Sequence, residues 1–186
     1  IALNETARQR IELENNLRNA IEKKEFLLFY QPKIEISTNK ILGAEALIRW
    51  NHPKLGMILP GDFIPVAEET GLIIDIGRWV LKEACRQNSK WQKQNLKPIS
   101  LAVNVSPRQF QYPGFYEDVS NAIEQSDLDP DFLELEITEG MLMSDVEKTV
   151  HKLNKLIGVG LTMSIDDFGT GYSNMKYLIR FPVSTL

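Results

Sequence analysis

Four apolar segments of this sequence each carry one side chain with a hard oxygen donor. The segments are ILGAEALIRW, SLAVNVS, LELEITE and LTMSIDDF, and the donors are Glu45, Asn104, Glu136 and Asp166. Ionised and polar groups are costly to bury without partners, so their presence needs a reason. Three carboxylates and an amide, with no histidine or cysteine, suit Mg²⁺ or Mn²⁺. Asp167, next to Asp166, could reach a second ion, as in the two-metal sites of phosphoryl chemistry.

The alternation of side chains along a β-strand places these donors on one face. Glu45 shares its face with Leu47 and Arg49, while Ala44, Ala46, Ile48 and Trp50 share the other. From Asn104 to Glu136 the interval is 32 residues (136 − 104), and from Glu136 to Asp166 it is 30 (166 − 136). Each interval is about one βα unit, so the donors would meet at the carboxyl ends of parallel strands.

Each of these residues has a simpler explanation when it is taken singly. Glu45 and Arg49 would form a structural ion pair, and Asn104 would satisfy a backbone group. Four such residues at matching positions on four strands favour the metal site. Two isolated histidines, His52 after a strand and His151 on a helix, give no basis for a histidine-based site.

Short apolar runs alternate with amphipathic stretches along the chain. The expected strands are 26–34, 42–50, 100–106, 133–139 and 161–168. The expected helices lie around 63–91, 115–126 and 145–157, after an opening helix whose apolar face carries Leu13, Leu17, Ala20 and Ile21. The last helix has a capping box, Ser144 with Glu147, and stops at Gly158 and Gly160. This order predicts an α/β fold with βαβ units and a largely parallel sheet.

Composition narrows the class of protein. The 186 residues are 43% hydrophobic, enough for the core of about one domain, and the net charge of −4 argues against binding a nucleic acid polymer. The single cysteine, Cys85, rules out an internal disulfide and is expected to be a helix packing residue. No apolar run reaches about 18 residues, and no signal peptide opens the chain. We expect a cytoplasmic domain, whose parent protein could still be tethered to a membrane through other domains.

These motifs resemble the EAL domain, the family of bacterial cyclic di-GMP phosphodiesterases. The likeness rests on six motifs in order: YQPK, GAEALIRW, PGDFIPVAEETGLI, VNVSPRQF, LEITE and DDFGTGYSN. It runs from about Phe26 to the C-terminus and implies a TIM-type (β/α)8 barrel whose first strand is antiparallel to the rest. The implied reaction is the hydrolysis of one phosphodiester of cyclic di-GMP to linear pGpG, with two Mg²⁺ or Mn²⁺ ions in the active state.

The resemblance also assigns roles to single positions. The implied metal ligands are Glu45, Asn104, Glu136, Asp166 and Asp167. The implied substrate contacts are Gln31, Leu47, Arg49 and Pro60, of which Arg49 would bind a phosphate through its planar guanidinium. Leu47 and Pro60 fall in segments that line the guanine pockets. Glu139 matches a glutamate that steadies the DDFGTGYSN loop, and it completes an implied catalytic set with Glu45, Asp166 and Asp167.

The resemblance further predicts the neighbours of this segment. It implies cyclic di-GMP as the ligand, a homodimer through the EAL domain, and an upstream GGDEF (diguanylate cyclase-like) or sensory domain. Residues 1–24 resemble the helical connector from such a module, and residues 25–186 resemble the EAL domain, incomplete at its C-terminus. The family's next strand carries KID, and this sequence stops at Pro182–Leu186 where that strand would begin. About five of eight strands are present, so we expect the native chain to continue and this segment alone to catalyse poorly.

Three functions stay open on this basis. The first is a metal-dependent cyclic di-GMP phosphodiesterase, favoured because all the matching ligand positions are intact. The second is a catalytically inactive cyclic di-GMP receptor. The third is a regulatory or dimerisation module that binds no nucleotide.

Overall fold

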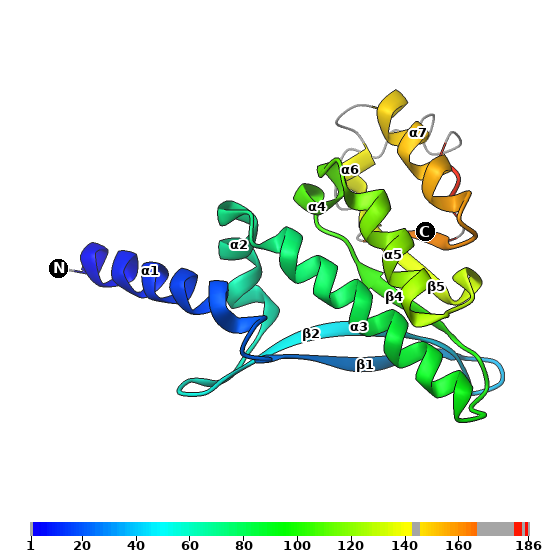
Figure 1. The fold of residues 1–186 in the computed structure, drawn as a ribbon, viewed down its shortest axis with the longest axis horizontal. Helices are drawn as coiled ribbons and strands as arrows, with labels where there is room; N and C mark the ends of the chain where they lie inside the picture. The colour runs from blue at the N-terminus through cyan, green and yellow to red at the C-terminus, as the bar shows by residue number, and fades with distance from the viewer. Residues whose placement is uncertain (1, 143–145, 167–180, 184, 186) are drawn as a thin grey trace.

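A mixed sheet is built from the segments that the sequence pattern predicts as strands. The computed structural model describes residues 2–142, 146–166, 181–183 and 185. Within them the sheet order follows the chain (Figure 1): β1 (Phe26–Glu35), β2 (Lys40–His52), β4 (Ser100–Asn104), β5 (Leu133–Thr138) and β6 (Thr162–Asp166). A short strand that the pattern did not predict, β3 (Gly56–Ile58), pairs with β2.

Strand direction agrees with the expected barrel. β1 is antiparallel to β2, and β2, β4, β5 and β6 are parallel to one another. Beyond β6, Thr185 forms a parallel bridge with Ser164, and the Ile165 amide donates to the Thr185 carbonyl at 3.1 Å. The parallel strands therefore present their carboxyl ends at one edge of the sheet, where α/β folds place their sites.

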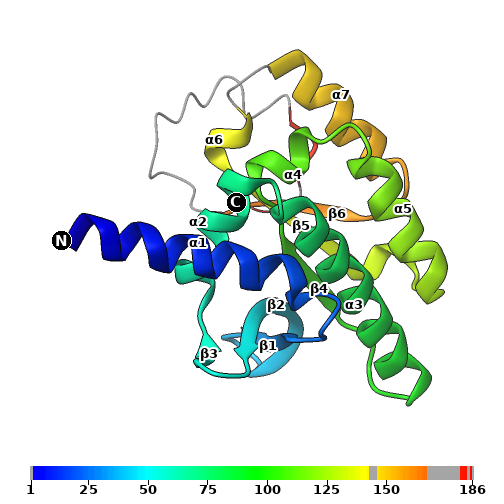
Figure 2. The same cartoon turned by 60° about the vertical axis from the view of Figure 1, so that its left-hand side comes forward.

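One face of the sheet forms the core against a row of helices. Figure 2 shows α3 (Ile73–Lys93), α5 (Phe115–Ser126) and α7 (Val146–Ile157) along one side of the strands. Strand residues that face them, such as Trp50, Leu101 and Leu135, are fully buried. Burying one such side chain stabilises the fold by about 1.5–3 kcal/mol. The alternation therefore leaves the opposite face to polar side chains, as the sequence pattern predicts.

The opening helix, α1 (Ala2–Ala20), packs on this body through its predicted apolar face. Leu17 and Ala20 are buried, and Leu13 and Ile21 pack against the core. The chain then turns into β1, where the Glu25 carboxylate accepts a hydrogen bond from the Trp50 indole at 2.9 Å. The last two turns of α1 are therefore part of the same core as the sheet.

The stretch around 63–91, expected as one helix, is two. α2 (Pro60–Thr70) ends before Gly71, whose φ of 84° is in the left-handed region that favours glycine. The Thr70 hydroxyl donates to the Val66 carbonyl at 2.7 Å and occupies one of the last acceptors of the helix. Short helices that the pattern did not predict are α4 (Pro107–Gln111), the 3₁₀ turn η1 (Pro130–Phe132) and α6 (Glu139–Leu142).

One strand ends earlier than predicted, and one residue of a predicted capping box lies outside the described residues. The strand expected to end at Glu139 ends at Thr138, because Glu139 begins α6. α7 ends at Ile157, just before Gly158, as predicted, whereas Ser144 of the expected capping box lies outside the described residues. In the part of the chain that is described, no helix is long and apolar enough to cross a membrane.

Candidate active site

Glu45 and Asn104 meet at the polar face of the sheet. The side-chain Nδ2 of Asn104, at the end of β4, donates to Oε1 of Glu45 on β2 at 2.6 Å. In this orientation the Asn104 carbonyl oxygen Oδ1 is not engaged by Glu45. The pair offers a carboxylate and an amide oxygen, and both are donors that suit a hard divalent cation.

Glu136 lies beside this pair in the register of the sheet. Asn104 and Glu136 are direct partners on β4 and β5, as their spacing predicts. Lys33 of β1 donates to Oε1 of Glu136 at 2.7 Å and to Oε1 of Glu134 at 3.4 Å. Burial raises the pKa of Glu136 above its usual value, and the hydrogen bond and charge of Lys33 oppose this shift. Burial acts against the charge of Lys33, but its contacts with Glu136 and Glu134 raise its pKa above the ordinary value.

Asp166 lies one pleat beyond these residues. Glu136 pairs with Ser164, and Asp166 pairs with Thr138, so Asp166 is two positions further along the sheet than the expected common point. Its neighbour Asp167 lies outside the described residues. Within the described ranges, no three histidine, cysteine, aspartate or glutamate side chains are grouped so as to hold a metal ion. Glu45, Glu136 and Asp166 therefore do not form such a group of three, and Asn104 is the amide donor of the expected set beside Glu45.

Arg49 and Gln31 lie on the same face as Glu45. Nη1 of Arg49 donates to the Ile48 carbonyl at 2.8 Å, and the guanidinium carbon lies 5.6 Å from the ring centre of Phe29. A cation at this distance from an aromatic face is attracted to it. Glu45 accepts from Asn104 instead of pairing with Arg49, so the simple ion pair considered from the sequence is not formed. Gln31 is exposed and stands directly opposite Glu45 across the β1–β2 pair.

A cavity of about 300 Å³ opens at the same end of the sheet. The predicted substrate contacts Leu47 and Pro60 line it, together with Asn104. Most of its wall is apolar, and Gln109 and Thr138 add hydrogen-bonding groups. Its volume is at the lower end of the range of about 300–1,000 Å³ that is common for small-molecule sites.

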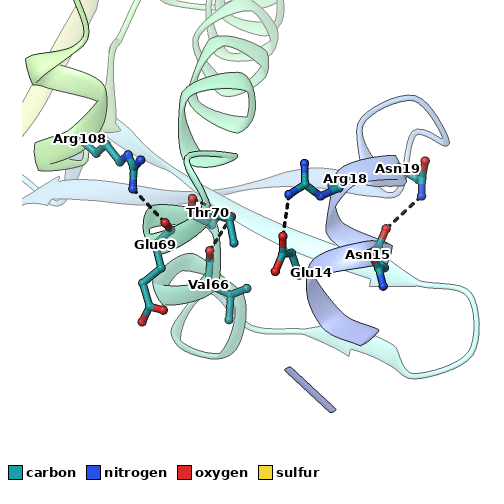
Figure 3. A network of polar contacts seen from close by, with 9 residues as sticks. Glu14, Asn15, Arg18, Asn19, Val66, Glu69, Thr70 and Arg108 are labelled. Atoms are coloured by element: carbon teal, nitrogen blue, oxygen red, sulfur yellow. Dashed lines mark hydrogen bonds and ion pairs between the residues drawn. The ribbon is translucent and has the colours of Figure 1, made fainter. Parts of the chain in front are cut away.

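Arg108 ties together two of the elements around this cavity. It extends from α4 to the end of α2 (Figure 3), where Nη1 donates to the backbone carbonyls of Glu68 and Glu69, the latter at 3.1 Å. A cation at a helix C-terminus satisfies carbonyls that have no partner within the helix. α2 carries Pro60 at its first turn, and α4 directly follows the β4 strand of Asn104, so Arg108 fixes one cavity wall against the other.

Glu139 and a second cavity also bear on where the site lies. Glu139, expected to steady the DDFGTGYSN loop, is buried at the start of α6, and residues 167–174 of that loop lie outside the described residues. A larger cavity, of about 670 Å³, lies between α1 and the β2–β3 hairpin and is lined by none of the expected site residues. The smaller cavity is lined by Leu47, Pro60 and Asn104, so we take it as the candidate site, with Glu45 adjoining it through its contact with Asn104.

Sequence reasoning missed three residues of this region: Lys33, Phe29 and Gln109. Lys33 belongs to the YQPK motif and shares the strand face of Gln31, so the alternation alone indicates its direction. Its contact with β5 could not be predicted, because β2 and β4 lie between the two strands in the sheet. Gln109 is buried on α4, a helix that the sequence pattern did not predict.

Comparison with known proteins supplies the family. The model of the EAL domain matches residues 14–186. This chain belongs to the EAL domain family. The match begins within α1, so it includes the part of that helix that is buried in the core.

Some curated relatives of this EAL domain are named as signalling or cyclic di-GMP proteins. The bifunctional diguanylate cyclase/cyclic di-GMP phosphodiesterase MucR of Pseudomonas aeruginosa is 44% identical over 185 residues, which are 100% of this chain and 27% of MucR. The signaling protein YkoW of Bacillus subtilis is 43% identical over 177 residues, which are 95% of this chain and 22% of YkoW. The chain thus spans about a quarter of the length of the curated relatives it matches.

Solved EAL structures confirm the predicted fold class. The MucR phosphodiesterase in complex with c-di-GMP superposes with a TM-score of 0.90 and 45% identity, over 93% of this chain and 70% of that one. The EAL enzyme Bd1971, bound to cAMP and cyclic di-GMP, gives a TM-score of 0.86 and 35% identity, over 96% of this chain and 50% of that one. The described strands therefore form part of a TIM-type barrel with an antiparallel first strand.

Proposed function

We propose that this EAL domain is part of a metal-dependent phosphodiesterase that hydrolyses cyclic di-GMP to pGpG. The observation that supports it best is the position of Asn104, which contacts Glu45 on β2 and is in register with Glu136 on β5. The relative MucR is named as a cyclic di-GMP phosphodiesterase, and its structure was determined with that ligand.

The donor set fits Mg²⁺ or Mn²⁺. Glu45 and Glu136 provide carboxylate oxygens and Asn104 provides Oδ1, with Asp166 one pleat beyond them. A divalent cation bound there would act as a Lewis acid toward a phosphate oxygen. Asp167 is the proposed ligand for a second ion, and Glu139 is proposed to support the loop that carries Asp167.

The remaining side chains would bind and orient the dinucleotide. Arg49 retains N–H groups besides the one given to Ile48, and a guanidinium can donate two parallel hydrogen bonds to a phosphate. Leu47 and Pro60 would place a guanine base against the apolar wall of the cavity. Gln31, opposite Glu45, would donate or accept a hydrogen bond at the edge of the site.

The whole protein would contain more than this segment. Because the chain spans about a quarter of the relatives it matches, we propose an upstream GGDEF or sensory domain and further strands that complete the barrel. Dimerisation through the EAL domain and a cytoplasmic location also stay predictions. The catalytic test therefore uses the full-length natural protein.

Product analysis by chromatography tests the proposal. Cyclic di-GMP is incubated with Mg²⁺ or Mn²⁺ and either the natural protein, its Glu45→Gln variant or its Glu124→Gln variant. Glutamine keeps the acceptor for Asn104 but removes the charge, so Glu45→Gln should lower the rate of pGpG formation by more than about 100-fold. Glu124 is exposed on α5, and its replacement should leave the rate within about twofold.

The other functions give different results in the same samples. Binding of cyclic di-GMP without formation of pGpG would mean that the protein is a receptor. Absence of binding heat with metal present would mean a regulatory module that binds no nucleotide. Either result overturns the phosphodiesterase proposal.

A further inference from the structure

Lys33 crosses the polar face of the sheet to reach the candidate metal site. It belongs to β1, and the two glutamates that it contacts belong to β5, three strands away in the sheet order. In a flat sheet, three strand spacings would separate them by about 14 Å. Side chains stand roughly perpendicular to a sheet, so tips in contact at 2.7 Å across three strand spacings indicate a sheet that curls toward this face, with Lys33 on its concave side.

The charges around Lys33 are unbalanced without it. Glu134 and Glu136 are two residues apart on the same strand face, and only 16% and 11% of their side chains are exposed. Glu45 adds a third negative charge that acts on Glu136. Like charges at such positions destabilise one another unless a cation lies among them. Lys33, whose side chain is 39% exposed, is the cation that fills this role among the described residues.

We propose that Lys33 is a resident counter-ion of the carboxylate site and sets its affinity for divalent metal. The inference depends on the metal site of the proposed function. The ammonium occupies Oε1 of Glu136, so a divalent cation that uses this carboxylate has a positive charge as its neighbour. Two cations on one carboxylate repel each other, and this repulsion weakens metal binding relative to a site without the lysine. In the metal-free protein the same lysine stabilises the glutamates.

Calorimetric titration with Mn²⁺ tests this proposal in the full-length protein without any turnover. Lys33→Met removes the charge and keeps the length of the side chain, and it should tighten Mn²⁺ binding by about tenfold. Lys33→Arg keeps the charge and should bind Mn²⁺ within about twofold of the natural protein. Lys82→Met, an exposed position on α3, is the matched control and should leave the affinity unchanged.

A thermal melt of the same variants gives a second readout. Without metal, Lys33→Met should melt at a lower temperature than the natural protein, because its glutamates lose their counter-ion. Saturating Mn²⁺ should raise its melting temperature by more than it raises that of the natural protein. If Lys33→Met does not fold without metal, the comparison is made on protein purified in Mn²⁺ and between Lys33→Arg and the natural protein.

The outcomes separate the two proposals. Unchanged or weaker Mn²⁺ binding by Lys33→Met, while the natural protein binds Mn²⁺, would overturn the counter-ion role and leave the metal site intact. Absence of Mn²⁺ binding by the natural protein and by both variants would overturn the metal site and the counter-ion together. If Lys33→Met binds Mn²⁺ and the natural protein does not, the lysine blocks the site, and this result supports the counter-ion role.

Discussion

At the scale of single residues, Arg49 shows how a strand can hold a charged group in a fixed direction. Its guanidinium lies against the ring of Phe29, half of which is exposed, and donates to its neighbour's carbonyl. The two contacts restrict a side chain that otherwise has many rotamers, so less entropy is lost when a phosphate binds. The planar fork is the property that a lysine would lack.

We therefore predict that Arg49→Lys weakens cyclic di-GMP binding about tenfold, a free-energy change of roughly 1.4 kcal/mol. The measurement is isothermal titration of the full-length protein. Arg86→Lys is the control, because Arg86 pairs with Glu83 on the outer side of α3. Equal affinity of Arg49→Lys and the natural protein would show that Arg49 does not bind a phosphate through its fork.

Tyr30 gives a prediction for the pH dependence of stability. Burial, followed by the charge of Glu83, raises its pKa to about 12, and its ring lies edge-on to Trp91 with centroids 4.7 Å apart. The native state thus favours the neutral phenol, and its stabilising effect is complete below pH 10. As the pH rises from 10 to about 12, the unfolded chain loses this proton first, so the free energy of unfolding falls.

Urea unfolding between pH 9 and pH 11.5 measures this effect. In Tyr30→Phe the free energy of unfolding should fall less steeply with pH than in the natural protein, because one group that titrates differently in the two states is removed. Other alkaline effects are shared by both proteins and cancel in the comparison. The same slope in both would contradict the role given to Tyr30.

At the scale of elements, the site depends on how the helices hold the strands. Asn88 of α3 is buried, and its amide donates to the carbonyl of Ile99 at 3.1 Å and of Phe132 at 3.0 Å. These carbonyls lie just before β4 and β5, the strands that carry Asn104 and Glu136. One side chain therefore fixes the starts of both strands against the same helix.

Asn88→Ala should lower the free energy of unfolding by about 2 kcal/mol, because two buried carbonyls lose a donor. Asn121→Ala, on the exposed side of α5, should change it by less than about 0.5 kcal/mol. Chemical denaturation of the two variants checks both values. If the free energy of unfolding falls no more in Asn88→Ala than in Asn121→Ala, Asn88 does not fix the starts of the two strands.

Most of these elements could be predicted because each strand has one apolar and one polar face. The same alternation identified Glu45, Asn104 and Glu136, and the register of β4 and β5 confirms that the last two are neighbours. What could not be predicted depends on contacts between distant segments. The position of α4 against the end of α2 depends on Arg108, and the ion pair of Lys33 depends on the curl of the sheet.

At the scale of the whole molecule, α1 is joined to the EAL domain by its last turns. The resemblance to the family predicts a boundary between connector and domain after residue 24. Leu17, which is 1% exposed, is nevertheless buried in the common core. The family match from residue 14 includes this leucine. The division between connector and domain stays a prediction, and the packing of Leu17 offers a way to test it.

Leu17→Ala should destabilise the domain by about 3 kcal/mol, the cost of removing a buried leucine side chain and leaving a cavity. Ile11→Ala, on the exposed side of α1, should cost less than about 0.5 kcal/mol. Thermal and chemical unfolding measure both. If Leu17→Ala leaves the domain as stable as before, residues 1–24 are an independent connector.

The central claim is that Glu45, Asn104 and Glu136 share a divalent cation on the polar face of the sheet. The most direct measurement is a crystal structure of the full-length protein with Mn²⁺ and cyclic di-GMP, with the manganese located by its anomalous scattering. We predict a manganese peak within coordination distance of all three side chains, with a ligand phosphate beside Arg49. A peak bound by other residues, or an ordered dinucleotide at this site with no manganese at saturating concentration, would contradict the claim.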